Sequence, residues 1–213
     1  MLEQKQTIFW DWNGTLLNDT TACVLAMNTI LSSRGMNTID EDYYRSVFNF
    51  PVKEYYKILG FDFSKESFED LSVDFISNYN ANLSSTALQP HAHEVLQFFK
   101  NKGLKQVVVS AMEQTMLLKQ LKMYGVFSYF DEVNGIDDIY ASSKTYLAKN
   151  YIEKHRTPVN QIVFIGDTLH DMEVAHEVGV DVILVSNGHH AHNRLQINGN
   201  RVINDLKSLL ELK

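Results

Sequence analysis

Two acidic segments of the chain carry residue types that could transfer a phosphoryl group. Asp11 opens the segment Asp-Trp-Asn-Gly-Thr and directly follows the apolar run 8–10. A carboxylate at the end of a strand, in a turn that contains a glycine, can attack phosphorus and form an aspartyl-phosphate. Because Asp-X-Asn-Gly is also common in ordinary turns, this segment alone leaves both interpretations open.

The second acidic segment is Gly-Asp-Thr-Leu-His-Asp at residues 166–171, and it also follows an apolar run. It places Asp167 and Asp171 four residues apart at the expected start of a helix. Carboxylate oxygens are the ligands that Mg²⁺ prefers, with substrate phosphate and water completing its coordination. One of the two could instead only cap the helix. Two carboxylates at this spacing, opposite Asp11, favour a metal site.

Ser110 and Lys144 are candidate phosphate ligands. Ser110 ends the apolar run 107–109 and is followed by Ala111 at an expected helix start, where backbone N–H groups can hold a phosphate oxygen. A capping role for this serine is compatible with that. Lys144 is expected in the first turn of a helix, where the helix dipole disfavours cations. Its position therefore indicates a nearby carboxylate or phosphate, unless it is a solvated surface lysine.

The elements that position these residues follow from the apolar pattern. Continuous β-branched and aromatic runs are typical of strands buried on both faces of a parallel sheet. They occur at 8–10, 107–109, 162–165 and 182–185, and helical patterns cover about 113–124, 142–155 and 169–178. Alternating strands and helices predict a doubly wound α/β domain, a Rossmann-like core. Ligands bind beyond the carboxyl ends of such strands, where Asp11, Ser110, Asp167 and Ser186 would converge.

A helical insertion separates the first predicted strand from the second. We expect helices through 24–31 and over 40–48, 52–59 and 65–83, with Asn18 or Asp19 capping the first. Gly35 and Gly60 have the character of helix ends. The predicted domains are an α/β catalytic core of residues 1–17 and 87–213 and a small α-helical cap domain of residues 18–86. By topology the cap should lie over the strand ends as a lid.

Composition excludes several functional classes. The 213 residues are 45% hydrophobic and 21% charged, with a formal net charge of −7, which argues against a nucleic-acid surface. No apolar run approaches the ~20 residues of a membrane span, and residues 1–6 are polar and lack the apolar stretch of a signal peptide. The single cysteine, Cys23, lies in an apolar helical pattern typical of inert packing. We therefore expect a soluble cytoplasmic protein, a monomer or a weak homodimer, without nucleic-acid or membrane partners.

Together, the aspartate turn, strand-end serine, lysine and Gly-Asp-Thr-X-X-Asp segment resemble the haloacid dehalogenase (HAD) superfamily of hydrolases. The resemblance covers essentially the whole chain, and the insertion looks like a C1-type cap of the phosphoglycolate phosphatase and β-phosphoglucomutase branch. It implies a phosphatase of a small phosphorylated metabolite, with Mg²⁺ as cofactor. Asp11 would be the nucleophile, Ser110 a phosphate ligand and Lys144 a neutralising cation. Asp11, the main-chain carbonyl of Asn13 and Asp167 would bind the metal, supported by Asp171, with Gly14 and Ala111 near the substrate.

One residue departs from the pattern of this family. Family phosphatases usually carry a second aspartate two residues after the nucleophile, which protonates the leaving alcohol and then activates water. Here Asn13 takes that place, and an amide cannot transfer a proton at neutral pH. The chain could be a slow phosphatase, could hydrolyse esters with good leaving groups, or could run other chemistry. On the slow-phosphatase reading, Asn13→Asp should raise kcat on alkyl phosphates by up to ~10²–10⁴-fold.

Three further hypotheses remain open at this stage. Phosphonoacetaldehyde hydrolase, in the same superfamily, also lacks the second aspartate and has a Trp after its nucleophile. It uses a cap lysine to form a Schiff base, and Lys53 falls in the cap at a similar distance from the nucleophile. A catalytically silent phosphate-binding regulator is the alternative of another class. Dehalogenation fits less well, because the retained Asp167 and Asp171 imply a metal. His189, His190 and His192 follow the fourth apolar run without a zinc spacing, and we expect a solvated loop; a substrate-facing histidine is the alternative.

Overall fold

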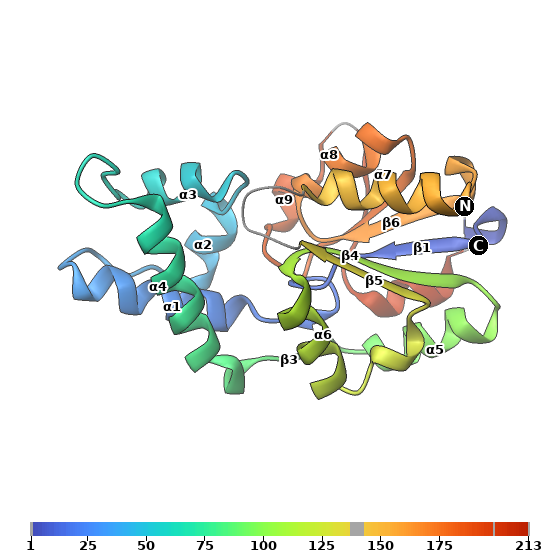
Figure 1. The fold of residues 1–213 in the computed structure, drawn as a ribbon, viewed down its shortest axis with the longest axis horizontal. Coiled ribbons are helices and arrows are strands. Elements are labelled where there is room, and N and C mark those ends of the chain that lie inside the picture. The colour runs from blue at the N-terminus through green and yellow to red at the C-terminus, as the bar shows by residue number, and fades with distance from the viewer. Residues whose placement is uncertain (1, 137–142, 198, 213) are drawn as a thin grey trace.

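A six-stranded parallel sheet forms the centre of the molecule in a computed structural model that describes residues 2–136, 143–197 and 199–212 (Figure 1). Its strand order is β5-β4-β1-β6-β7-β8, and every neighbouring pair is parallel. The strands are β1 (Thr7–Trp10), β4 (Lys105–Glu113), β5 (Glu132–Ile136), β6 (Ile162–Gly166), β7 (Asp181–Val185) and β8 (Arg201–Ile203). This is the predicted doubly wound α/β fold.

The order of the strands reverses at β1. From β1 the chain builds β4 and β5 on one side, then crosses back to build β6, β7 and β8 on the other. Such a reversal point is where open α/β sheets bind ligands. In the register of the sheet, Trp10 pairs with Val108 of β4 and with Ile165 of β6, so Asp11 emerges level with the end of β6, while β4 continues beyond it to Glu113.

Helices cover both faces of this sheet, and two clusters of buried side chains lie beneath them. On one face Ile8 and Trp10 of β1 pack with Val95 and Phe99 of α5 and with residues of α6. On the other face Phe9 packs with residues of α7 and α8. The core helices are α5 (Ala92–Asn101), α6 (Gln114–Met123), α7 (Lys144–His155), α8 (Leu169–Val178) and α9 (His192–Leu195). Short 3-10 helices span Leu2–Gln4, Leu83–Ser85, Phe127–Tyr129, Val159–Gln161 and Leu206–Glu211.

Four helices between β1 and β4 form a separate body at one end of the molecule (Figure 1). They are α1 (Thr20–Ser33), α2 (Glu41–Val47), α3 (Val52–Ile58) and α4 (Phe68–Ala81). Their buried side chains make a cluster of their own, with Met27 and Ile30 of α1 against Tyr56 and Leu71. Where the chain enters and leaves this body, β2 (Leu17–Asn18) and β3 (Ala87–Leu88) pair as an antiparallel ribbon.

The predicted helices agree with the structure within a few residues, with three differences. Strand β4 continues to Glu113, so Ser110 lies inside a strand instead of at a helix start, and Glu113 caps α6 through its carboxylate. The predicted helix 142–155 begins at Lys144; residue 142 lies outside the described residues. Strands β2, β3, β5 and β8 and helix α5 were not predicted. Among the described residues, no helix is both long and apolar enough to cross a membrane.

Candidate functional site

Lys144 joins two buried carboxylates at the carboxyl end of the sheet. Its Nζ lies 2.7 Å from Oδ1 of Asp11, directly after β1, and 2.6 Å from Oδ1 of Asp171 in the first turn of α8. The side chain of Lys144 is 4% exposed, and that of Asp171 is fully buried. A lysine buried in the first turn of α7 is therefore explained by two carboxylate partners, as its unfavourable place on the helix dipole indicated.

Asp171 is held mainly by its own turn. Its Oδ2 accepts from the backbone N–H of Asp167 and Thr168 at 3.1 and 2.9 Å and from the Thr168 hydroxyl at 2.8 Å. Thr168 in turn caps α8, so the two residues form a capping box. A side chain at Gly166 would overlap Asp171, so the glycine is needed here. Asp171 thus accepts four hydrogen bonds from protein donors, which makes it a support for Lys144 and the turn.

Asp167 lies beside these residues in a cradle of small groups. Its Oδ1 accepts from the hydroxyl of Thr15 at 2.8 Å, and its Oδ2 accepts from the backbone N–H of His189 at 2.6 Å. A methyl group at Gly14 or at Gly188 would overlap this carboxylate. Gly14 also has φ +76°, a conformation that favours glycine. Thr15, Gly188 and His189 were not assigned this role from the sequence.

Among the described residues, three carboxylates and a single ammonium group share this buried space. One oxygen each of Asp11, Asp167 and Asp171 lies within 4.8 Å of the others. Burial raises the pKa of Asp11 well above its usual range, and the neighbouring Asp171 and Asp167 raise it further, against Lys144. Burial likewise raises the pKa of Asp167 to about 6. Burial opposes charge on Lys144 too, but its two carboxylate partners raise its pKa above the usual value. The excess negative charge makes this cluster a candidate site for a divalent cation.

Ser110 reaches the same end of the sheet by a different local structure from the one predicted. The register between β4 and β5 shifts between Val109 and Glu113, which marks an irregularity in the strand after Ser110. Ser110 is 1% exposed and its hydroxyl accepts from the backbone N–H of Met112 at 3.1 Å, while Ala111 is exposed. The helix N-terminus expected to hold phosphate beside Ser110 begins only at Gln114.

The turn after Asp11 is held by a carboxylate that lies outside the predicted site. Asp19, at the start of α1 and 1% exposed, accepts from Nδ2 of Asn13 at 2.6 Å and from the backbone N–H of Gly14 at 3.0 Å. The Gly14 N–H also donates to the carbonyl of Leu17 at 2.8 Å. Gly14, predicted near the substrate, therefore has its N–H engaged by the protein. Asp19 was predicted as a helix cap, but its side chain makes no capping hydrogen bond.

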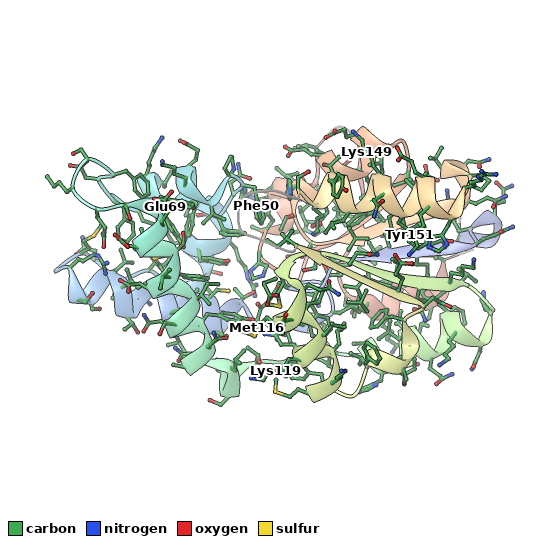
Figure 2. All side chains as sticks on the ribbon, in the orientation of Figure 1. Phe50, Glu69, Met116, Lys119, Lys149 and Tyr151 are labelled. Atoms are coloured by element: carbon green, nitrogen blue, oxygen red, sulfur yellow. The ribbon has the colours of Figure 1, made fainter. Side chains whose placement is uncertain are left out.

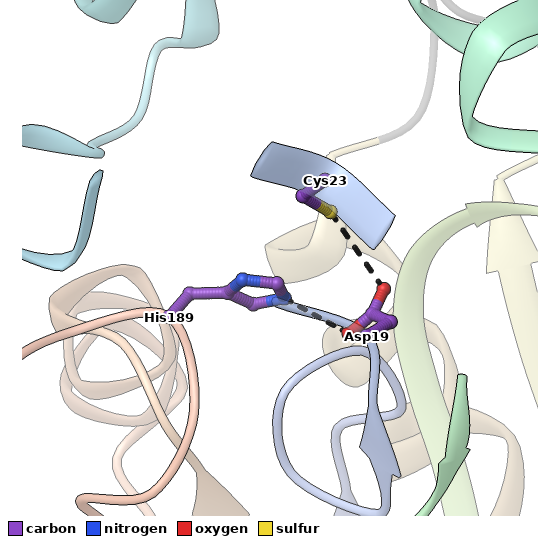
Figure 3. A group of neighbouring side chains, drawn as sticks. All are labelled: Asp19, Cys23 and His189. Atoms are coloured by element: carbon purple, nitrogen blue, oxygen red, sulfur yellow. Dashed lines mark hydrogen bonds and ion pairs between the residues drawn. The ribbon is translucent and has the colours of Figure 1, made fainter. Parts of the chain in front are cut away.

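Asp19 also pairs with His189 from the loop after β7 (Figure 3). Nε2 of His189 lies 3.3 Å from Oδ1 of Asp19, and its Nδ1 lies 3.0 Å from the hydroxyl of Tyr44 in α2. Burial opposes protonation of His189, but Asp19 and then Asp167 and Asp11 raise its pKa to about 9. Cys23 Sγ lies 3.9 Å from Asp19, and burial raises the pKa of its thiol well above the usual value, in agreement with inert packing.

The expected solvated histidine loop was wrong for two of its three members. His189 is 5% exposed and His190 is fully buried, whereas His192 is exposed and bonds the Ser186 hydroxyl. His190 Nδ1 accepts the first N–H of α8, from Leu169, at 3.2 Å. Nδ1 can accept this bond because it carries no proton. Burial disfavours the charged form of the ring and lowers the pKa of His190 to about 3. Ser186, predicted to converge on the site, bonds the exposed His192 instead.

The helical body formed by α1–α4 contacts this loop through aromatic rings. Phe48, after α2, lies 5.5 Å from the His189 ring and 6.1 Å from the His190 ring, measured between centroids. Phe50 stacks on His170 of α8 at 4.7 Å, at the junction between the two bodies (Figure 2). Arg194 of α9 donates to the backbone carbonyls of Arg45 and Phe48 at 2.8 and 2.7 Å. These contacts come from the last turn of α2 and the segment that follows it, which lie against the core.

Lys53 is not brought to the carboxylate cluster. It is exposed on α3, and its Nζ lies 5.2 Å from the ring centroid of Phe63 and 5.7 Å from that of Phe68, both in the same helical body. The contacts described for Lys53 are these cation–π contacts within the helical body. Trp12, the other feature shared with phosphonoacetaldehyde hydrolase, is fully buried, and its indole N–H donates to Gln120 at 2.7 Å.

Comparison with known proteins identifies the family. Residues 8–185 match the haloacid dehalogenase-like hydrolase family. The chain belongs to this family. A phosphoglycolate phosphatase of Rhodobacter capsulatus is 22% identical over 187 residues, which cover 85% of this chain and 84% of that protein. The tyrosine-protein kinase PtkA of Mycobacterium tuberculosis is 21% identical over 213 residues, covering 99% and 72%.

Solved structures of HAD-like proteins share the whole fold. A haloacid dehalogenase-like family hydrolase from Streptococcus pneumoniae superimposes with a TM-score of 0.86 at 18% sequence identity, covering 98% of each chain. PtkA superimposes with a TM-score of 0.81, also at 18% identity, covering 97% of each chain. Identities this low establish the common fold, including the helical insertion. The reaction of this HAD hydrolase must therefore be inferred from its own residues.

Proposed function

We propose that this chain is a Mg²⁺-dependent phosphatase that acts on small phosphorylated metabolites through an aspartyl-phosphate on Asp11. The observation that carries the proposal is the buried ion-pair cluster in which Lys144 joins Asp11 to Asp171. Lys144 fixes the Asp11 carboxylate at the end of β1 and offsets part of its charge. Phosphoryl groups are anionic, so a single lysine among three carboxylates is insufficient to hold one.

The residues fit the metal that this family employs. Asp171 accepts four protein hydrogen bonds, whereas Asp167 accepts one at each oxygen and Asp11 is paired at Oδ1 alone among the described contacts. Asp11, Asp167 and the main-chain carbonyl of Asn13 would hold Mg²⁺, and Asp171 would support Lys144. When bound, the cation neutralises charge on the phosphoryl oxygens.

In the first step a carboxylate oxygen of Asp11 bonds to phosphorus, and the bond from phosphorus to the ester oxygen breaks. The departing oxygen must take up a proton. Asn13 has none to give at neutral pH, so this proton comes from water, and esters with good leaving groups are favoured. In the second step water attacks the phosphorus of the aspartyl-phosphate, which releases phosphate and regenerates the carboxylate. Ser110 and Lys144 are the groups that would hold the phosphoryl oxygens.

We further propose that residues 18–86 act as the substrate-selecting cap and that residues 1–17 and 87–213 are the catalytic core. The β2–β3 ribbon lies at both crossings between these parts, and the insertion has its own apolar cluster. The segment with Phe48 and Phe50 contacts the core histidines, which supports a role in covering the site.

The test is hydrolysis of a panel of phosphate esters, with and without Mg²⁺, by the wild type and by Asp11→Asn. We expect Mg²⁺-dependent turnover that the variant loses, and a phosphorylated Asp11 peptide after acid quenching of the wild type. Absence of turnover with retained phosphate binding would instead support a regulator. Cleavage of phosphonoacetaldehyde with a borohydride adduct on Lys53 would support the C–P hydrolase.

A further inference from the structure

The Asp19 carboxylate has more partners than a structural acid at a helix start needs. Its Oδ2 accepts from Nδ2 of Asn13 at 2.6 Å and from the hydroxyl of Tyr79 at 2.9 Å. Its Oδ1 accepts from the Gly14 N–H at 3.0 Å and faces Nε2 of His189 at 3.3 Å. A carboxylate offers about four lone-pair sites, so these donors fill it.

The donors come from three parts of the molecule that are distant in sequence. Asn13 and Gly14 belong to the turn of the nucleophile, Tyr79 to cap helix α4, and His189 to the core loop after β7. The backbone N–H of His189 also donates to Asp167. Asp19 therefore contacts the nucleophile turn and the cap directly, and His189 connects it to Asp167, a candidate metal ligand.

A metal at this place is the competing explanation, because one ligand atom each of Asp19, Cys23 and His189 lies within 4.8 Å of the others (Figure 3). Cysteine, histidine and aspartate together suit a transition metal. However, the Asp19 oxygens are already occupied by N–H and O–H donors, and a metal would have to displace them. The described contacts favour a closed hydrogen-bond network.

The network also fixes the orientation of the Asn13 amide. An ionised carboxylate only accepts hydrogen bonds, so the amide must present its NH₂ to Asp19. Its Oδ1 is the atom left for a ligand, and it can accept a hydrogen bond but not donate one. An aspartate at position 13 would instead place a second carboxylate about where Nδ2 stands, 2.6 Å from Oδ2 of Asp19.

We propose that Asp19 is a positioning residue that makes an amide obligatory at position 13 and ties the nucleophile turn to the cap. The acid and the amide of this turn form a pair, with the carboxylate at 19 and the amide at 13. The catalytic consequence rests on the proposed phosphatase function, whereas the pairing itself does not. The expectation from the sequence, that Asn13→Asp alone raises kcat, changes accordingly: the new acid needs an amide at position 19.

The pairing is tested by urea unfolding of Asn13→Asp, Asp19→Asn and the double exchange, with Asn18→Asp as control. Asn18 is exposed, so its variant adds the same charge to the same stretch without a carboxylate neighbour at 2.6 Å. We expect a lower urea midpoint for both single variants than for the wild type. The double exchange should recover part of that loss, because it restores one acid and one amide but not the ion pair of Asp19 with His189. A midpoint for Asn13→Asp equal to that of Asn18→Asp, or a double exchange no better than the worse single variant, would overturn the pairing.

The catalytic consequence is tested by kcat on an alkyl and an aryl phosphate. Asn13→Asp alone should give no gain on the alkyl ester, while the double exchange should gain by up to ~10²–10⁴-fold and gain less on the aryl ester, whose leaving group barely needs a proton. A change in stability alone would not produce this leaving-group dependence. A full gain from Asn13→Asp alone would overturn the positioning role. If no variant hydrolyses any ester, the phosphatase proposal fails and the unfolding cycle still decides the pairing.

Discussion

Two buried charged clusters meet at the nucleophile turn, and they are built in different ways. In the carboxylate–lysine cluster, Asp11 and Asp167 directly follow β1 and β6. The Asp19 network instead joins a helix start, a turn, a cap helix and a loop. The first cluster is set by the parallel sheet, because strands in register end at one edge. The second exists only when the cap lies on the core.

The two clusters therefore suit different roles: one suits the reaction itself, and the other holds the site in place. The carboxylate–lysine cluster has excess negative charge, which suits a cation and a phosphoryl group. The Asp19 network is nearly balanced, with one carboxylate facing one histidine and neutral donors. Variants in the first cluster should therefore affect turnover and metal binding, and variants in the second should affect stability and the geometry of the turn.

The largest effect should come from Asp11→Asn, which removes the proposed nucleophile. We expect kcat to fall by at least ~10⁴-fold, as for loss of other covalent catalysts. The fold should persist, because Lys144 keeps its partner Asp171 at 2.6 Å. Steady-state turnover and circular dichroism of the same preparation check this. Turnover above a trace from a folded variant would contradict the assignment of Asp11.

Lys144→Met should destabilise the same cluster, because it removes the only ammonium group described there. Removing one partner of a buried pair typically costs about 3–5 kcal/mol, here because Asp11 and Asp171 would face each other unpaired. Lys149→Met is the matched control on α7 (Figure 2), since its ion pair with Glu177 is about half exposed and is expected to contribute about 0–1 kcal/mol. Urea unfolding in EDTA measures both. Equal losses would contradict the buried role of Lys144.

Metal affinity should distinguish the two aspartates of the second segment. Asp171→Asn removes a support, and such changes typically cost ~10–100-fold in metal affinity. Asp167→Asn removes a proposed direct ligand and should cost more. Asp171 has four protein hydrogen bonds, so its variant should lose relatively more stability. Calorimetric Mg²⁺ titration and urea unfolding test this, and equal Mg²⁺ affinities would count against the assignment.

The Asp19 network should make stability depend on pH through His189. The folded-state pKa of His189 is raised to about 9, above the 6.5 of an ordinary histidine. The resulting stability is fully present below pH 6.5 and is lost as pH rises through 9. The difference between these two pKa values corresponds to about 3 kcal/mol of stability. Unfolding free energies of the wild type and His189→Gln at pH 6 and 9.5 in EDTA measure it, with the exposed His192→Gln as control. Parallel pH curves would contradict the ion pair with Asp19.

The sequence predicted the elements that carry their own local signal. The four continuous apolar runs lie in β1, β4, β6 and β7, and the predicted helix 169–178 has the same bounds as α8. Strand β5 has the sequence Glu-Val-Asn-Gly-Ile and strand β8 only three residues, so neither shows such a run. Helix α5 did carry a signal, since Val95, Leu96 and Phe99 recur at helical spacing, and it was overlooked.

The residues of the site also divide into those that the sequence predicted and those that it could not predict. Asp11, Asp167, Asp171 and Lys144 could be named because each lies in a short segment with a recognisable spacing, and the structure brings these four together. The burial of His189 could not be predicted, because it depends on Tyr44, a residue 145 positions away in the cap. The partners of Asp19 are likewise fixed by tertiary contacts. A local pattern indicates which residues can react, but the contacts between cap and core decide how they are held.

The smallest effect should come from Lys53, which lies away from both clusters. Its ammonium group contacts the rings of Phe63 and Phe68 on an exposed surface, and such contacts contribute about 0.5–1 kcal/mol. Lys53→Met should therefore lower stability slightly and leave kcat, KM and Mg²⁺ affinity unchanged. Lys57→Met is the matched control, because Lys57 lies on the same helix and pairs with Glu54 at 2.7 Å on the surface. Steady-state kinetics with a phosphate ester and urea unfolding of both variants measure these effects. A loss of turnover specific to Lys53→Met would mean that the cap reaches the nucleophile in another arrangement, and that the separation of Lys53 from both clusters does not hold during the reaction.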